Sequence, residues 1–478
     1  MKLLVVATVL LVIGLAAMML IRRKTTEGGF KQYISDSEYR DSLHAQFQER
    51  LNAKAPENID EQGIEALVEK LLDPRDPTFA TEQLRSLNER AVPMLVRALS
   101  DRRFFTEVEG EYLFPSAPAV KVVRLLEPLR PEAAIEPLAS MLDEKPKYLR
   151  QAAAHALGFI AKDECIATLQ NALAAPEDYV RTYAMMGIQK AVKDQQGSTQ
   201  FRSAIFESII PLLNRKDNSM SEAPETLLIL DPIKGAAAMS DDRVLNLTNP
   251  ILTQCLYALN KHQAVVPADR LHHLMQGVRD DLSTYPNDAI YGESLIALAR
   301  TADPALDALI QETLKHSNKR LVESAAQALS VQKGVGGIMD KIWRRYSAEE
   351  QLSRLTDVEQ NIIGVRLLID QVNNGGFSQY FFNSSGDHIE ETFRGLQAIK
   401  APETEALLRK AIQVFGRGGP SPNRDKRMGQ MEKFSSKADA QLDALNDAFF
   451  KDNENREAKL ELYIAEQSEM LKALADPK

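Results

Sequence analysis

The sequence repeats itself with a shift of 31 residues, and this repetition constrains the fold more than any other feature. AIEPLASMLDEKPKYLRQAAAHAL, at 134–157, aligns with CIATLQNALAAPEDYVRTYAMMGI, at 165–188. Each copy predicts a helix, a turn containing proline and a second helix rich in small residues. One helical hairpin cannot cover its own apolar face, so successive hairpins are expected to stack. The matched pairs are Ile135 with Ile166, Leu138 with Leu169, Leu142 with Leu173, Tyr148 with Tyr179, Arg150 with Arg181 and Ala153 with Ala184.

The repetition extends over 61–333. A third copy at 305–329 ends in the same alanine-rich second helix, and an earlier copy is expected at 91–129 with a longer loop between its helices. The pattern resembles short HEAT-like repeats of roughly 30 residues, and the resemblance implies an array of helices that serves as a binding surface. An irregular helical bundle is the alternative.

A polar stretch at 215–243 interrupts the repetition and predicts a long surface loop. It contains the apolar run Leu227-Leu228-Ile229-Leu230. This run either packs back onto the repeats or docks a partner.

The amino-terminal residues 3–21 are apolar apart from Thr8 and Gly14. At about 1.5 Å per residue they form a helix of roughly 28 Å, which predicts a membrane-spanning anchor within residues 1–24. Arg22, Arg23 and Lys24 follow the span, so the positive-inside rule places the bulk of the chain in the cytoplasm, on a single-pass inner-membrane protein. Residues 25–60 are predicted to be a charged tether.

The composition narrows the possible partners. A net charge of -9 over 478 residues gives no basic excess, so direct binding to nucleic acid is not expected. The two cysteines, Cys165 and Cys255, lie far apart in apolar contexts and are predicted to be buried thiols. The sequence therefore predicts no metal site and no cofactor.

Gly334 to Gly337 mark a break, after which 338–478 predict a compact helical domain. The most unusual stretch of this domain is VNNGGFSQYFFNSSG, from Val372 to Gly386. The asparagines and glycines are predicted to end one helix, because both residue types tolerate the left-handed backbone of a helix end. Asp387 and Glu390 then predict a capping box for the next helix. The overall prediction is an all-α chain: an N-terminal transmembrane helix, a HEAT-like repeat array and this C-terminal domain.

The stretch has two interpretations. In the first, its residues only form a tight corner between helices. In the second, its amides and aromatic rings bind a protein partner or ligand. The candidate partner-binding residues are Asn373, Asn374, Phe377, Gln379, Tyr380 and Asn383.

These residues also carry a family resemblance. VNNGGFSQYFFNSSG, followed by the helix start Ala-Pro-Glu and by LDALNDAFFKDNENREAKLELYIAEQ, resembles the DNA-mimic-protein-like family over 343–471. One departure is Gln371, where the family has an acidic residue directly before the valine. The resemblance implies an all-helical domain and, in a founding member, an acidic surface that imitates DNA and occupies a transcription factor. From Lys341 to Lys478 there are 20 Lys and Arg against 22 Asp and Glu, a balance that does not favour such mimicry here.

Two further sets of residues could support catalysis or anion binding. His388, Asp387 and either Ser384 or Ser385 could in principle form a hydrolytic triad, but no nucleophile-elbow motif accompanies them. A glycine-rich loop carries a candidate anion-binding set, although it lacks the spacing of a phosphate-binding loop. That set comprises Arg417, Arg424, Lys426 and Arg427.

The sequence thus predicts a membrane-anchored, non-enzymatic scaffold for an unknown protein partner. The alternatives are a regulator that sequesters a nucleic-acid-binding protein and an unrecognised hydrolase in the C-terminal domain.

Overall fold

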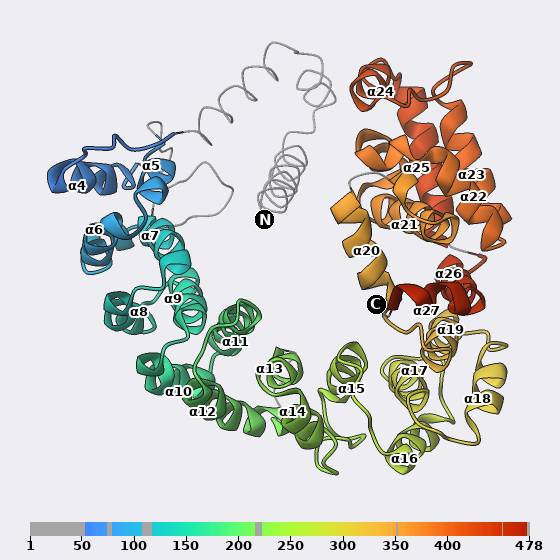
Figure 1. Cartoon of the computed structure of the whole chain (residues 1–478), viewed down its shortest axis with the longest axis horizontal. Helices are drawn as coiled ribbons and strands as arrows, with labels where there is room; N and C mark the ends of the chain where they lie inside the picture. The colour runs from blue at the N-terminus through green and yellow to red at the C-terminus, as the bar shows by residue number, and fades with distance from the viewer. Residues whose placement is uncertain are drawn as a thin grey trace. The chain divides into compact units, whose positions relative to one another are not determined.

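The computed structural model describes residues 53–73, 79–107, 117–215, 222–349, 352–451 and 453–475. Within these ranges the chain forms helices joined by short connections and contains no strand (Figure 1). The chain divides into two compact units, residues 1–238 and 239–478. The division falls at the C-terminal end of α14 (Pro232–Met239).

The predicted transmembrane helix is corrected. None of the helices in the described ranges is long and apolar enough to cross a bilayer. Residues 1–24, and the tether as far as residue 52, lie outside the described residues. Neither the membrane anchor nor the single-pass inner-membrane localisation is therefore supported, and both are withdrawn. The longest described helix, α21 (Asp357–Phe382), has 26 residues but is interrupted by charges at Asp357, Glu359, Arg366 and Asp370.

The first unit is built from helical hairpins. The two aligned copies form α8–α9 and α10–α11, and Figure 1 shows α8 and α10 in one row with α9 and α11 in a second. The turn before α9 ends in Pro146, and the turn before α11 contains Pro176. The helices are α4 (Glu61–Lys70), α5 (Ala80–Leu87), α6 (Val92–Ala98), α7 (Pro118–Leu126), α8 (Ile135–Met141), α9 (Lys147–Ile160), α10 (Ile166–Ala174), α11 (Asp178–Lys193), α12 (Thr199–Ile209), α13 (Glu222–Leu230) and α14.

Glycine residues set the distance between α9 and α11. A Cβ atom at Gly158 would collide with the carbonyl oxygen of Ala184, and one at Gly187 would collide with the carbonyl oxygen of His155. The two backbones therefore touch where they cross, with Ala153 and Ala184 fully buried nearby. Small side chains at the crossing permit this approach.

The predicted loop at 215–243 is instead largely helical, because α13 and α14 occupy most of it. Leu227 and Leu228 of α13 are buried, so the apolar run does pack back onto the array. Sequence reasoning missed the helices because α13 is covered on several sides and has no clear amphipathic pattern. Residues 216–221 lie outside the described ranges.

The second unit begins with further hairpins and ends with the helices of the C-terminal region. Between them, Gly334 and Gly337 adopt positive φ angles, which forms the predicted break. The hairpin helices are α15 (Leu252–Lys261), α16 (Ala268–Val278), α17 (Asn287–Leu298), α18 (Leu306–Thr313) and α19 (Lys319–Gln332). The others are α20 (Ile338–Glu349), α21, α22 (Ile389–Ala398), α23 (Pro402–Gln413), α24 (Arg424–Met431), α25 (Ser436–Lys451), α26 (Arg456–Glu466) and α27 (Ser468–Ala475).

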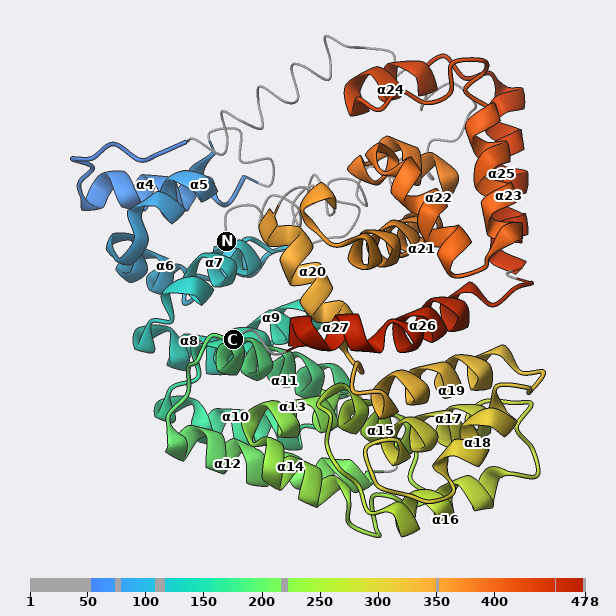
Figure 2. The same cartoon turned by 45° about the vertical axis from the view of Figure 1, so that its right-hand side comes forward.

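Helix α26 lies along α19, the last helix of the hairpin series (Figure 2). The Ser330 hydroxyl donates to a carboxylate oxygen of Glu461 at 3.1 Å. The Lys319 ammonium donates to the Lys451 carbonyl at 2.8 Å, and the Asn455 amide donates to the Lys319 carbonyl at 3.1 Å. The C-terminal region thus continues the stack of helices within the second unit.

Candidate functional site

The Asn-Gly corner, residues 372–386, begins with a break in α21 at Gly375 and Gly376, where the sequence predicted that one helix ends, and extends past Phe382, the last residue of α21. Gly376 has φ of 75° and ψ of -177°, a conformation that side chains other than glycine rarely adopt. The backbone amide of Phe377 donates to the Asn446 side chain of α25 at 2.8 Å. Asn446 therefore accepts the hydrogen bond that the kink removes from the helix, and the chain resumes helical geometry up to Phe382.

The aromatic residues of the corner are core residues. Phe377, Tyr380 and Phe381 are fully buried. The Tyr380 hydroxyl lies 2.9 Å from the Thr392 hydroxyl on α22, and burial raises the pKa of Tyr380. Of the candidate partner-binding residues, Phe377 and Tyr380 thus face the interior, where they position α21 against α22 and α25.

The amide side chains divide into two pairs. Gln379 and Asn383 both donate to the Gln371 side-chain oxygen, at 3.3 and 2.6 Å, so they are used within the corner. Asn373 and Asn374 are exposed. Gln371 was absent from the predicted set, because residues eight apart lie about 12 Å apart along a regular helix. The break at Gly375 and Gly376 brings Gln371 to Gln379, and no local pattern indicates this contact.

Arg427 of α24 is fully buried and ties the corner to its neighbours. Its guanidinium donates to the carbonyls of Phe381, Asn383 and Ser421, at 2.5, 2.9 and 2.7 Å. It also pairs with the Asp387 carboxylate at 2.7 Å. A buried guanidinium requires such a counter-charge and a full set of acceptors.

This pairing overturns the predicted capping box. The N-cap of α22 is His388, one residue after Asp387, and its side chain makes no capping hydrogen bond, while the Asp387 carboxylate accepts from Arg427. The burial of Arg427 also divides the predicted anion-binding set into one buried and three exposed residues. Arg427 is enclosed, whereas Arg417, Arg424 and Lys426 are exposed.

The exposed arginine next to the corner joins the two predicted sets. The Arg424 guanidinium lies over the Phe382 ring, 5.4 Å from its centroid, and its Nε donates to the Phe382 carbonyl at 2.9 Å. Phe382 is 40% exposed and directly precedes Asn383. Sequence reasoning missed Phe382 because it adjoins two core aromatics; its position outside their i, i+3, i+4 spacing was the available signal.

The C-terminal region can be compared with known families on this basis. Residues 353–467 match the family described as DMP19-like protein. The match includes the Asn-Gly corner and extends from the turn before α21 into the start of the connection after α26. It confirms the C-terminal resemblance, and we refer to residues 353–467 as the DMP19-like segment. No curated protein matches the chain.

The residues of the possible hydrolytic triad each bind a different partner, and one of these partners, Tyr346, precedes the DMP19-like segment. The Ser385 hydroxyl donates to the Tyr380 carbonyl at 2.7 Å, while Asp387 pairs with Arg427. His388 Nε2 lies 3.3 Å from the Tyr346 hydroxyl, and burial lowers the pKa of His388. Ser384 is exposed.

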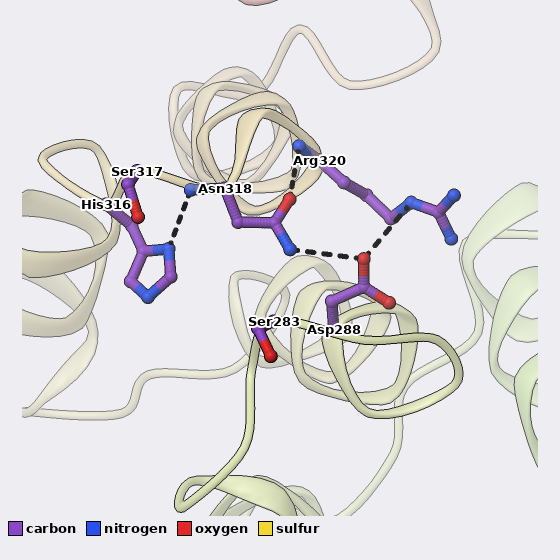
Figure 3. Close-up of a pocket in the computed structure, with 6 residues that line it drawn as sticks. All are labelled: Ser283, Asp288, His316, Ser317, Asn318 and Arg320. Atoms are coloured by element: carbon purple, nitrogen blue, oxygen red, sulfur yellow. Dashed lines mark hydrogen bonds and ion pairs between the residues drawn. The ribbon is translucent and has the colours of Figure 1, made fainter.

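A polar pocket of about 450 Å³ lies outside the DMP19-like segment, at the N-terminal ends of α17 and α19 (Figure 3). Its central carboxylate, Asp288, is 6% exposed. It accepts a hydrogen bond from Asn318 at 3.2 Å and pairs with Arg320 at 3.5 Å. These groups satisfy one another and fasten α17 to α19, so the pocket is a structural junction.

The described residues contain no group of three or more His, Cys, Asp or Glu that could hold a metal ion. Cys165 and Cys255 are free and buried, and burial raises the pKa of their thiols to about 11 and about 12. Neither thiol is activated for nucleophilic chemistry.

Proposed function

We propose that this protein is a non-enzymatic helical scaffold that binds protein partners. In this proposal the hairpins are HEAT-like repeats, and the DMP19-like segment supplies a docking surface at the end of the array. The partner is a protein and not DNA.

The observation that carries the proposal is the packing of α26 on α19. This packing joins the DMP19-like segment to the hairpin series, so within the second unit the helices of both regions form one continuous stack. Stacked hairpins of this kind present rows of exposed side chains, since each helix buries only part of its circumference. Tyr257 on α15 is 59% exposed, and aromatic residues are enriched on surfaces that bind other proteins.

The contacts of the polar side chains near the Asn-Gly corner, and the two buried thiols, support a function without catalysis. Ser385, Asp387 and His388 are each bound to a different neighbour, so Ser385 is not hydrogen-bonded to His388 as a nucleophile is to its base. The pKa of both thiols is raised, which keeps them protonated near neutral pH.

Affinity capture tests the proposal. The full chain, tagged and cross-linked in extracts of its own cells, is expected to retain a reproducible protein partner, with cross-links to the exposed faces of the repeat helices or of α21 to α25. An extract that yields no reproducible partner, or a purified chain that turns over ester or phosphoester substrates, would contradict it.

A second candidate function is favoured by one feature of α25. Asp439, Asp443 and Asp447 are all exposed and recur every four residues, so they form a row with about 6 Å between steps. Such a row on a DMP19-like segment suits a regulator that sequesters a DNA-binding protein. The two functions are distinguished by adding double-stranded DNA to the captured complex at 150 mM salt, because DNA releases a partner held by mimicry and leaves a scaffold partner bound.

A further inference from the structure

We infer that the surface around Phe382 and Arg424 binds an acidic peptide segment of a partner protein. We call this surface the Phe382 patch; its centre is Phe382 with Arg424, and it takes in the exposed cations nearest to Arg424 in the sequence, Arg417 and Lys426. The inference rests on the proposed scaffold function and names the chemistry of its partner.

The centre of the Phe382 patch is an exposed ring covered on one side by a guanidinium. Phe382 keeps 40% of its surface in contact with solvent, although it follows two fully buried aromatic residues. Arg424 is fixed over the ring by its hydrogen bond to the Phe382 carbonyl. An aromatic ring and an arginine are the two side-chain types most enriched where proteins bind one another.

The net charge of the Phe382 patch indicates which kind of peptide segment it can bind. Arg417, Arg424 and Lys426 are exposed, and none of them has an ion pair among the described residues. One exposed acid, Asp425, lies between two of them in the sequence. The patch is therefore net positive and complements carboxylates, in contrast to the aspartate row of α25.

The platform beneath the Phe382 patch is rigid. Arg427, three residues after Arg424, is fully buried and bonded to the carbonyls of Phe381 and Asn383, on either side of Phe382. Phe381 also packs against Phe415, two residues before Arg417, with ring centroids 4.9 Å apart. A preformed surface lowers the ordering cost of binding, so a short segment suffices as the ligand.

The probe is a fluorescein-labelled synthetic peptide with one Phe flanked on each side by two Glu and two Asp residues. Its binding to the full chain is measured by fluorescence anisotropy at 50 mM salt. A chain with Arg417→Gln, Arg424→Gln and Lys426→Gln is expected to bind at least tenfold more weakly. The control chain carries Arg344→Gln, Lys410→Gln and Lys437→Gln, which remove three other exposed cations of the same region, and is expected to change binding less than twofold.

A second pair of variants tests the ring independently of charge. Phe382→Ala is expected to weaken binding about fivefold, whereas Phe450→Ala, which truncates an exposed aromatic on α25, leaves binding unchanged. The fluorescence of Trp343, the single tryptophan of the chain, reports whether each variant keeps its fold.

Equal weakening in the two triple variants would overturn the inference, as would no binding of the peptide at 100 µM or no effect of Phe382→Ala. Tighter binding of phosphatidylserine vesicles, lost in the same triple variant, would overturn the peptide as occupant. If a captured partner stays bound to the Arg417, Arg424 and Lys426 variant, the scaffold proposal stands and the inference fails.

Discussion

The crossing of α9 and α11 and the Asn-Gly corner both bring backbone segments into close contact, by different means. At the crossing, Gly158 and Gly187 meet backbone atoms of the facing helix, with alanines buried beside them. At the corner, the guanidinium of Arg427 links three carbonyls and one carboxylate from two connected stretches of chain. The first contact depends on shape, and the second depends on a buried charge.

The difference follows from regularity. In the repeat array both helices satisfy their own backbone hydrogen bonds, so only the absence of side chains is needed for close packing. The corner leaves carbonyls in the interior at the C-terminal end of α21 and in the loop before α24, and buried carbonyls without donors are costly. A charged donor that reaches several of them at once meets that need.

The largest effect is expected from removing the buried charge. Arg427→Met retains much of the apolar volume but leaves Asp387 and three carbonyls without their donor. We expect the second unit to lose about 3–5 kcal/mol of its free energy of unfolding. Urea unfolding followed by the fluorescence of Trp343, which packs on the same core, measures this loss.

The neighbouring exposed residue supplies the control for this prediction. Arg417→Met is expected to change the free energy of unfolding by no more than about 0.5 kcal/mol, because its side chain is exposed. A loss below about 1 kcal/mol for Arg427→Met would show that solvent replaces its hydrogen bonds, and that the corner is not held by charge.

A smaller loss is expected at the crossing, where only shape is disturbed. In Gly187→Ala the new methyl group meets the His155 carbonyl, so α9 and α11 must separate. We expect the first unit to lose about 1–3 kcal/mol, the usual range for overpacking. Faster hydrogen exchange in α9 and α11, with unchanged Trp343 fluorescence, would locate the effect in the first unit.

A second glycine-to-alanine substitution serves as the control for Gly187→Ala, because it replaces the same residue type where there is space for the methyl group. Gly429 lies in α24, and a Cβ atom there has no neighbour within 4 Å. Gly429→Ala is therefore expected to stabilise its helix by up to about 1 kcal/mol. Destabilisation of similar size at both positions would contradict a role for close packing at Gly187.

The sequence was informative where periodicity governs packing. Ile362, Val365, Ile369 and Val372 recur at the spacing of one helix face and are all buried, and Pro402 begins α23 at the Ala-Pro-Glu helix start. The aligned repeat copies also mark real hairpins, because small and apolar residues recur at the positions where helices touch.

The sequence was uninformative where long-range polar contacts decide the structure. Arg427 was placed with exposed cations because nothing in its neighbourhood of charged residues indicates burial. Its partners, Asp387 and the carbonyl of Phe381, are about forty residues away, and a local pattern assigned Asp387 to a helix cap. The Phe382 patch depends on the same tertiary contact. Its three cations were predicted only as part of an anion-binding set, and Phe382 was in neither predicted set.

The smallest expected effect is a pH-dependent change in the free energy of unfolding, and it arises at the junction of α19 and α26, where the carboxyl group of Glu461 is buried. Desolvation raises the pKa of Glu461, further raised by Glu457 and opposed by the hydrogen bond from Ser330 and by Arg366. The folded state therefore holds the Glu461 proton more tightly than the unfolded state does. Its contribution to stability is greatest below the ordinary glutamate pKa of about 4.3 and falls as the pH rises through the raised value.

Glu461→Gln tests this contribution because glutamine keeps an acceptor for Ser330 and does not titrate. The difference in unfolding free energy between variant and native chain is expected to increase in favour of the variant between pH 4 and pH 7, while other titrating groups cancel. A variant that becomes relatively less stable over this range would mean that Arg366 of α21 stabilises the charged carboxylate, and that an ionic interaction within the DMP19-like segment holds Glu461 in place beneath α19.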